Sequence, residues 1–127
     1  MEIDMHGPTL QGWTILLVED EPMIAMDIEQ AFGASGASMT TTTTLGHALL
    51  LIDAGLSAAI VDHAWGDGDC SALCTRLTER GVPFIVYSGN RHRKGPCSGA
   101  PHIDKPAAAG VLVAAVVNLV RRAEMAN

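Results

Sequence analysis

Five residues that could bind a metal ion or transfer a phosphoryl group each follow a short apolar run of the chain. They are Glu19, Asp20, Asp62, Ser88 and Lys105. In an open parallel α/β sheet, ligands bind beyond the carboxyl ends of the strands, so residues in such positions meet at one edge. Each residue alone is more often structural, as a loop acid, a turn hydroxyl or a surface charge. Their shared placement at predicted strand ends is what indicates a site.

The residue types at this edge favour phosphoryl chemistry. Glu19, Asp20 and Asp62 would repel one another, which favours protonation of one of them unless a cation joins them. Mg²⁺, a hard ion that prefers oxygen ligands, fits three carboxylates better than a softer metal does. With Lys105 and Ser88 nearby, a carboxylate beside the metal can attack phosphorus while cations neutralise the phosphoryl oxygens. The expected product is an aspartyl phosphate on Asp62.

Alternating strand and helix patterns must position these residues. The apolar runs 14–18, 58–61 and 82–87 predict buried strands, the polar, threonine-rich run 38–43 predicts an edge strand, and 101–104 is a short fifth candidate. Helical spacing of apolar residues follows four of these runs. Short loops between alternating strands and helices predict an α/β fold with a doubly wound parallel sheet.

The segment from Gly89 to Ala100 interrupts this alternation. It contains glycines and a proline before Ala100 and has no apolar periodicity. We therefore expect a mobile loop there, with a fourth helix that is short or disordered.

Size and charge limit the classes of function. The chain has 127 residues, 48% of them hydrophobic, which suits one domain over 13–124 after an N-terminal tail (1–12), with no output domain. A net charge of −6 argues against nucleic-acid binding. No apolar run is long enough for a membrane span, and the N-terminus lacks the pattern of a signal peptide. We expect a cytoplasmic protein.

Three cysteines stand at positions 70, 74 and 97. They cannot all pair within one chain, and none belongs to a CxxC motif. Cys70 and Cys74 are one helical turn apart and could form half of a metal site, but matched ligands elsewhere are missing. The expectation is three ordinary reduced thiols.

The motifs together resemble those of response-regulator receiver domains over residues 14–123. The matching stretches are Leu16 to Pro22 (LLVEDEP), Val61 and Asp62, Tyr87 to Gly89, and Lys105 and Pro106. The resemblance implies a flavodoxin-like five-stranded sheet of order 2-1-3-4-5. It also implies a single-domain phosphorelay switch, phosphorylated by a histidine kinase or histidine phosphotransferase. Such a switch would either shuttle or drain phosphoryl groups among kinases or bind a downstream protein target, and the sequence leaves both open.

The resemblance assigns a role to each matching residue. Asp62 would be the phosphoacceptor, with Asp20 and Asp62 binding Mg²⁺ directly, Glu19 binding it through water, and Ala64 offering its backbone carbonyl. Ser88, the amide of Gly89 and Lys105 would bind the phosphoryl oxygens, and the Lys105–Pro106 peptide bond would be cis. Such a protein is not an enzyme on other substrates; it catalyses only its own Mg²⁺-dependent phosphorylation and dephosphorylation.

Two departures from the family pattern carry further expectations. His102 stands where many receivers have a Tyr or Phe that moves inward on phosphorylation, so it is a candidate switch residue with Ser88, although a plain strand histidine is the simpler interpretation. Pro83, Phe84, Ser88 and Gly89 resemble a subgroup of single-domain receivers with a reduced fourth helix.

Three alternatives stay open at this point. A degenerate receiver would bind proteins without being phosphorylated, although such domains typically lose one of the residues named above. A phosphatase of related topology would need a second acid two residues after the nucleophile, where Ala64 stands. The last helix, over 107–123, is apolar on several faces, which makes a homodimer a further candidate assembly.

Overall fold

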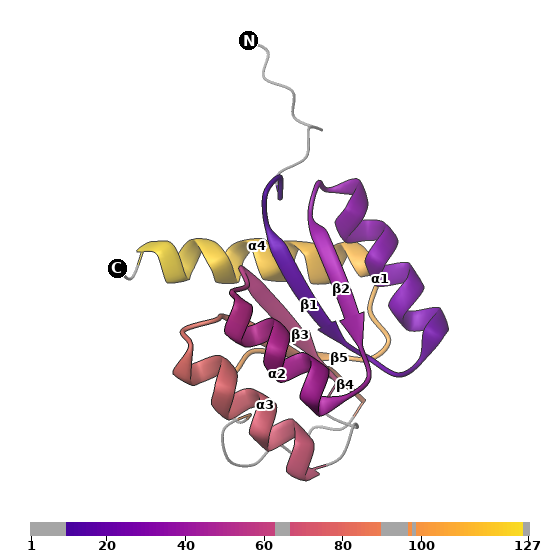
Figure 1. Ribbon diagram of the computed structural model, residues 1–127. Coiled ribbons are helices and arrows are strands. Elements are labelled where there is room, and N and C mark those ends of the chain that lie inside the picture. Colours follow the sequence, from indigo (N-terminus) through magenta and orange to yellow (C-terminus); the bar gives the residue numbers. More distant parts are fainter. Residues whose placement is uncertain (1–9, 63–66, 90–96, 98, 126–127) are drawn as a thin grey trace.

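The computed structural model describes residues 10–62, 67–89, 97 and 99–125. The elements are β1 (Thr14–Val18), α1 (Pro22–Ala34), β2 (Ser38–Thr42), α2 (Leu45–Ala54), β3 (Ala58–Val61), α3 (Asp67–Glu79), β4 (Phe84–Ser88), β5 (His102–Asp104) and α4 (Ala109–Met125). Strands and helices alternate up to β4 (Figure 1). This alternation confirms the predicted α/β class.

The five strands form one parallel sheet in the order β2-β1-β3-β4-β5. The predicted flavodoxin-like order is therefore confirmed. β3, with the sequence AAIV, is buried along its whole length and lies at the centre of the sheet. β2, with the sequence SMTTT, forms an edge, where one side of the backbone has no neighbouring strand and polar residues are tolerated.

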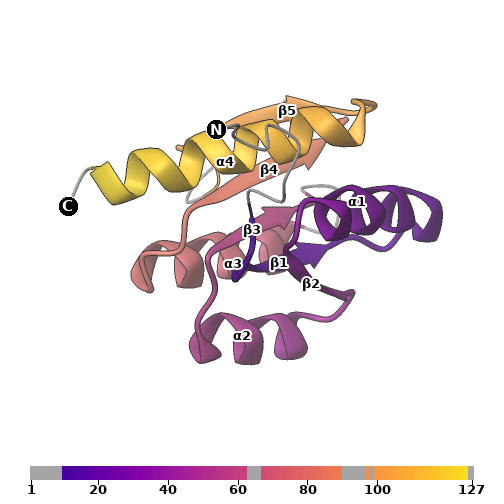
Figure 2. The same cartoon turned by 90° about the horizontal axis from the view of Figure 1, so that it is seen from above.

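Helices cover both faces of the sheet. α1 and α4 lie on one face and α2 and α3 on the other, as the two views together show (Figures 1 and 2). Alternate residues of β1 face different layers: Leu16 and Val18 pack with α2 and α3, whereas Ile15 and Leu17 pack with α1 and α4. The sheet thus separates two apolar cores.

Local sequence explains where the helices begin and end. Pro22 occupies the first turn of α1, where its missing N–H removes no helical hydrogen bond. Thr44 caps α2 by accepting a hydrogen bond from the backbone N–H of His47 at 3.4 Å. α2 ends at Gly55, whose φ of +105° is a conformation that side chains disfavour.

An exposed charge cluster joins α2 to α3. Arg76 donates through one nitrogen to both oxygens of Asp53, at 2.9 and 2.7 Å. Arg80 donates to Asp53 Oδ1 at 3.1 Å. Together with the core beneath them, these bonds fix the two helices side by side.

The ends of the described chain add to the core on the α1–α4 face. Leu10 is fully buried there, upstream of the expected 13–124 range, and its N–H bonds the carbonyl of Ser35 at 2.9 Å. α4 buries Leu112, Val116 and Val120, while Val111 is 49% exposed. The homodimer suggested for this helix stays a prediction.

The described residues between β4 and β5, namely 89, 97 and 99–101, contain no α-helix, and the expected short or disordered helix of this connection stays a prediction. Most of the expected mobile loop, residues 90–96 and 98, lies outside the described residues. Across the described ranges, none of the helices has the length and apolar character needed to cross a bilayer.

Candidate functional site

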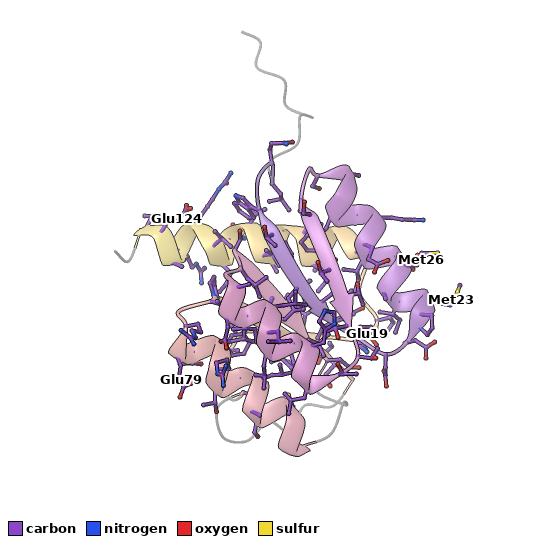
Figure 3. All side chains as sticks on the ribbon, in the orientation of Figure 1. Glu19, Met23, Met26, Glu79 and Glu124 are labelled. Atoms are coloured by element: carbon purple, nitrogen blue, oxygen red, sulfur yellow. A yellow bond between two sulfur atoms is a disulfide. The ribbon has the colours of Figure 1, made fainter. Side chains whose placement is uncertain are left out.

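The predicted site residues follow adjacent strands at one edge of the sheet. Glu19 follows β1, Asp62 follows β3, Ser88 ends β4 and Lys105 follows β5. Parallel pairing aligns the ends of these strands: Val18 lies opposite Val61, and Ser88 lies opposite Asp104. Figure 3 shows Glu19 at the arrowhead end of β1.

The three acids come together there. Each contributes a carboxylate oxygen to a group in which all three atoms lie within 4.8 Å of one another. Glu19 and Asp62 are buried, at 2% and 3% exposure, whereas Asp20 is exposed. One side of the acidic cluster is therefore closed by protein and the other faces solvent.

Lys105 is the cation of this cluster. Its Nζ lies 3.0 Å from Glu19 Oε1 and donates to Glu19 Oε2 at 3.3 Å. The same ammonium is 3.4 Å from Asp62 Oδ2. Burial opposes the charge of Lys105, but Glu19 and Asp62 outweigh it and raise the pKa of the ammonium. Lys105 is thus held in its charged form between two carboxylates.

The surroundings of Glu19 act on its carboxyl in opposite directions, with a net rise in its pKa. Burial raises the pKa of its carboxyl, and the charge of Asp62 raises it further, against the lowering effect of Lys105 and of the Glu21 N–H. Glu19 also accepts that N–H on Oε2 at 3.2 Å. Its other oxygen, Oε1, is buried, and its partner among the described residues is the Lys105 ammonium at 3.0 Å.

This donor set fits Mg²⁺. Three carboxylates supply only oxygen, the ligand type that a hard divalent ion prefers, and the exposed side at Asp20 leaves room for water ligands. Glu19 Oε1 is buried and, among the described residues, is paired only with the Lys105 ammonium at 3.0 Å, so it keeps acceptor capacity for a cation or its water. The expected fourth ligand, the carbonyl of Ala64, lies outside the described residues.

Tyr87 has a structural role at this site that the sequence did not reveal. Its hydroxyl accepts from the backbone N–H of Ala107 at 3.0 Å and lies 3.3 Å from the carbonyl of the same residue. Its ring centroid is 5.4 Å from Lys105 Nζ. The sequence offered one signal for this role, because a buried tyrosine needs a hydrogen-bond partner for its hydroxyl. Tyr87 therefore fixes the turn that contains Lys105 and the cis peptide bond to Pro106, which was expected.

Ser88 ends β4, the neighbour of β3, at the carboxyl end of the sheet where the acids lie. Ser88 is fully buried, and its carbonyl accepts the N–H of Lys105 at 3.1 Å, so the chain segments before and after the β4–β5 connection are tied together at the site. Gly89 follows Ser88 directly and is exposed.

The candidate switch residue His102 lies on β5, opposite Val86 of β4. Its Nδ1 is 3.3 Å from Asp104 Oδ1, and its side chain is 9% exposed. A switching role for His102 stays a prediction.

The expectation of three reduced cysteines is wrong for two of them. Cys74 of α3 forms a disulfide with Cys97, and Cys70 Sγ lies 3.2 Å from Cys97 Sγ. Sequence spacing could not reveal this arrangement, because it arises only when the β4–β5 connection returns Cys97 to the face of α3.

Comparison with known proteins supports the fold assignment. No protein-family model and no curated protein sequence matches the chain. Among solved structures, the receiver domain of the TMAO respiratory system response regulator TorR is 26% identical, with a TM-score of 0.75, over 87% of this chain and 98% of that one. A response regulator receiver protein from Sinorhizobium medicae WSM419 is 21% identical, with a TM-score of 0.76, over 91% and 99%.

A third structure, the receiver domain of the Francisella response regulator 1452, is 24% identical, with a TM-score of 0.74, over 87% of this chain and 98% of that one. The fold of the chain is that of a CheY-like response-regulator receiver domain.

Proposed function

We propose that this protein is a phosphoryl-accepting switch of a two-component phosphorelay, in which Asp62 receives the phosphoryl group. The observation that carries the proposal is the convergence of Glu19, Asp20 and Asp62 with Lys105 at the carboxyl edge of the sheet.

Asp62 is suited to act as the nucleophile. Its carboxylate is buried at the end of the central strand β3, so its position is set by the sheet and not by a loop. A carboxylate oxygen of Asp62 attacks the phosphorus of a phosphohistidine, a P–O bond forms, and the P–N bond breaks with the electron pair leaving on the imidazole nitrogen. Hydrolysis reverses the modification, because water attacks the same phosphorus and releases inorganic phosphate.

Glu19, Asp20 and Asp62 would hold Mg²⁺, with a further contribution from the Ala64 carbonyl, and the bound ion would neutralise charge on the phosphoryl oxygens during transfer. Lys105 provides the protein's own share of this charge compensation. It lies 3.4 Å from Asp62 Oδ2, so a phosphoryl group on Asp62 would fall within its reach.

Ser88 and Gly89 would carry the signal away from Asp62. Phosphorylation replaces the single negative charge of the Asp62 carboxylate with a phosphoryl group that carries about −1.5 to −2 units of charge. The Ser88 hydroxyl, the Gly89 amide and Lys105 are donors that this charge attracts, and the first two begin the β4–β5 connection. We propose that displacement of this connection changes a surface that a downstream protein target reads.

The surface beside the site suits a protein donor. Met23 and Met26 project from α1 with 70% and 51% of their area exposed (Figure 3). A cavity of about 350 Å³ lies next to them, between α1 and the turn after β5, and includes Ile24, Asp27 and Lys105. Exposed methionines adapt to varied partners. We propose that a histidine kinase or phosphotransferase docks here, in the cytoplasm.

The test is covalent labelling followed by intact mass. Incubation with Mg²⁺ and acetyl phosphate or phosphoramidate should add one phosphoryl group to the wild type and none to Asp62→Asn. Asp27→Asn, at an exposed acid of α1, is the matched control and should be labelled like the wild type. Omission of Mg²⁺ should abolish labelling. An unlabelled wild type would overturn the proposal in favour of a degenerate receiver that binds proteins without phosphorylation.

A further inference from the structure

Three cysteines that are distant in the sequence meet in the core on the α2–α3 face. Cys70, Cys74 and Cys97 are each no more than 1% exposed, and their sulfur atoms lie within 4.8 Å of one another. Cys70 and Cys74 are one turn apart on α3, while Cys97 belongs to the connection between β4 and β5. The cluster therefore joins a helix to the segment that leaves Ser88.

Cys97 is the central member of this cluster. It is bonded to Cys74, and its sulfur also lies 3.2 Å from the sulfur of Cys70, which is within van der Waals contact. Cys97 Sγ is 3.5 Å from the backbone carbonyl of Cys70, so the reduced thiol of Cys97 has an acceptor in place. Both the disulfide and the dithiol form therefore have partners at this position.

We propose that Cys70, Cys74 and Cys97 form a thiol–disulfide site in which Cys97 bonds to either helix cysteine, and that oxidation ties the β4–β5 connection to α3. In a reducing compartment the site holds thiols, and it closes when a low-molecular-weight disulfide accumulates. Two helix cysteines facing one partner distinguish this arrangement from an isolated structural bridge.

The chemistry of closure balances with such a disulfide as the oxidant. Because the three sulfur atoms are buried, the first step takes place in a transiently opened form, in which the Cys97 thiolate attacks one sulfur of the small disulfide and releases a small thiolate. The Cys74 thiolate then attacks Cys97 in the mixed disulfide and releases the second small thiolate, so two protein thiols are oxidised and one disulfide is reduced to two thiols. Exchange within the site needs no oxidant: the Cys70 thiolate attacks Cys97, and Cys74 leaves as a thiolate and takes up a proton.

The consequence for signalling rests on the function proposed above. Cys97 lies between Ser88 and Lys105 along the chain, and both of these are expected to bind the phosphoryl group. A covalent bond to α3 limits how far this connection can move when Ser88 and Gly89 adjust to Asp62. We expect the oxidised protein to be phosphorylated several-fold more slowly than the reduced protein.

Thiol counting tests the site without any phosphorylation. The full chain is equilibrated in glutathione buffers from reducing to oxidising, quenched in denaturant with N-ethylmaleimide and weighed intact. As the buffer becomes more oxidising, the wild type should change from three N-ethylmaleimide adducts to one. Cys70→Ser and Cys74→Ser should each change from two adducts to none. Cys97→Ser should retain two adducts throughout. Alanine variants repeat the series, with circular dichroism to establish folding, in case a buried serine prevents it.

Two results would overturn the site: three adducts on the wild type under oxidising buffer, or loss of both adducts from Cys97→Ser. If added Zn²⁺ protects all three reduced thiols from N-ethylmaleimide, and no disulfide forms in any of the glutathione buffers, the cysteines form a metal site and not a thiol–disulfide site. The coupling is tested separately, by acetyl phosphate labelling of the reduced and oxidised wild type. Equal rates would overturn the coupling alone, whereas no labelling in either state would reject the proposed phosphorelay function and leave the thiol result intact.

Discussion

The Lys105 ammonium contacts both oxygens of the Glu19 carboxylate, at 3.0 Å and 3.3 Å, and is slightly farther from Asp62 at 3.4 Å. Among the described residues, Glu19 is thus the closest charge partner of Lys105. The pair links the carboxyl ends of β1 and β5, two strands that β3 and β4 separate in the sheet. It also sets the electrostatic balance on which several measurable properties depend.

Replacement of Lys105 should destabilise the protein, because Glu19 and Asp62 would lose their compensating charge. Lys105→Met leaves two buried carboxylates without a compensating charge, so the free energy of unfolding at pH 7 should fall by roughly 1–3 kcal/mol. Urea denaturation without Mg²⁺ measures the change. Arg121→Met, at an exposed position of α4, is the control and should change stability little. A loss no greater than that of the control would contradict this account.

Removal of the Glu19 charge should have the opposite effect. Burial and Asp62 raise the pKa of Glu19 above 4.5, so the folded protein holds this proton more tightly than the unfolded chain does. The resulting contribution to stability is present below about pH 4.5 and is lost as the pH rises through the higher folded pKa. Glu19→Gln should therefore add roughly 1 kcal/mol at pH 7 and almost nothing at pH 4.

The same substitution should weaken the response to Mg²⁺. Thermal unfolding of the wild type should shift to higher temperature as Mg²⁺ is added, because a ligand that binds only the folded state stabilises it. Glu19→Gln should shift less. A variant that loses stability at pH 7, or that responds to Mg²⁺ as the wild type does, would count against the assignment of Glu19.

The Tyr87 hydroxyl should matter for labelling as well as for stability. Tyr87→Phe keeps the ring near Lys105 and removes the bonds to Ala107, which should reduce stability by about 0.5–1.5 kcal/mol and slow phosphorylation by acetyl phosphate. Ser35→Ala removes a hydroxyl that donates at 3.0 Å to the carbonyl of Ala31, away from the site. The serine variant should lose some stability but keep the wild-type rate; a similar slowing in both variants would refute a role for Tyr87 at the site.

The charge cluster between α2 and α3 predicts a pH dependence of opposite sign. The Arg76 hydrogen bond is the main cause that lowers the pKa of Asp53 below 3.8, so its stabilising effect is present above that pH and is lost as the pH falls through the lower folded value. Asp53→Asn should be less stable than the wild type at pH 7 and should match it in acid. Glu79→Gln, which removes a looser 3.8 Å contact with Arg76, is the comparison and should change stability less.

The exposed methionines of α1 predict a split between two phosphoryl donors. Met23→Ser combined with Met26→Ser should leave labelling by acetyl phosphate unchanged, because neither residue belongs to the acidic cluster. Transfer from a histidine phosphotransferase that labels the wild type should become slower. Equal slowing with both donors would instead indicate damage to the site itself.

The fold could be predicted because local and global signals agree. β3 is apolar throughout and central, β2 is polar and at an edge, and Pro22 and Gly55 mark helix ends where the structure has them. The meeting of the acids with Lys105 followed from the rule that parallel strands end at one edge. These features depend on residues close in sequence, or on a general property of parallel sheets.

The features that escaped prediction depend on how the β4–β5 connection and the turn after β5 fold back. The Tyr87 bonds to Ala107 join β4 to the turn after β5, and the disulfide joins Cys97 to α3. Neither contact has a sequence period or a fixed spacing. The burial of Leu10 likewise depends on where the chain passes before β1.

The separation of the core into two layers has a consequence for how this sequence can diverge. Leu17 and Val18 are neighbours in β1, yet one packs with α1 and α4 and the other with α2 and α3. A change of volume at Leu17 can be compensated only within the core layer that includes α1 and α4, and one at Val18 only within the layer that includes α2 and α3. The layer that holds the cysteines can therefore be repacked while the layer beneath Met23 and Met26 stays as it is, so descendants of this chain could alter these two surfaces independently.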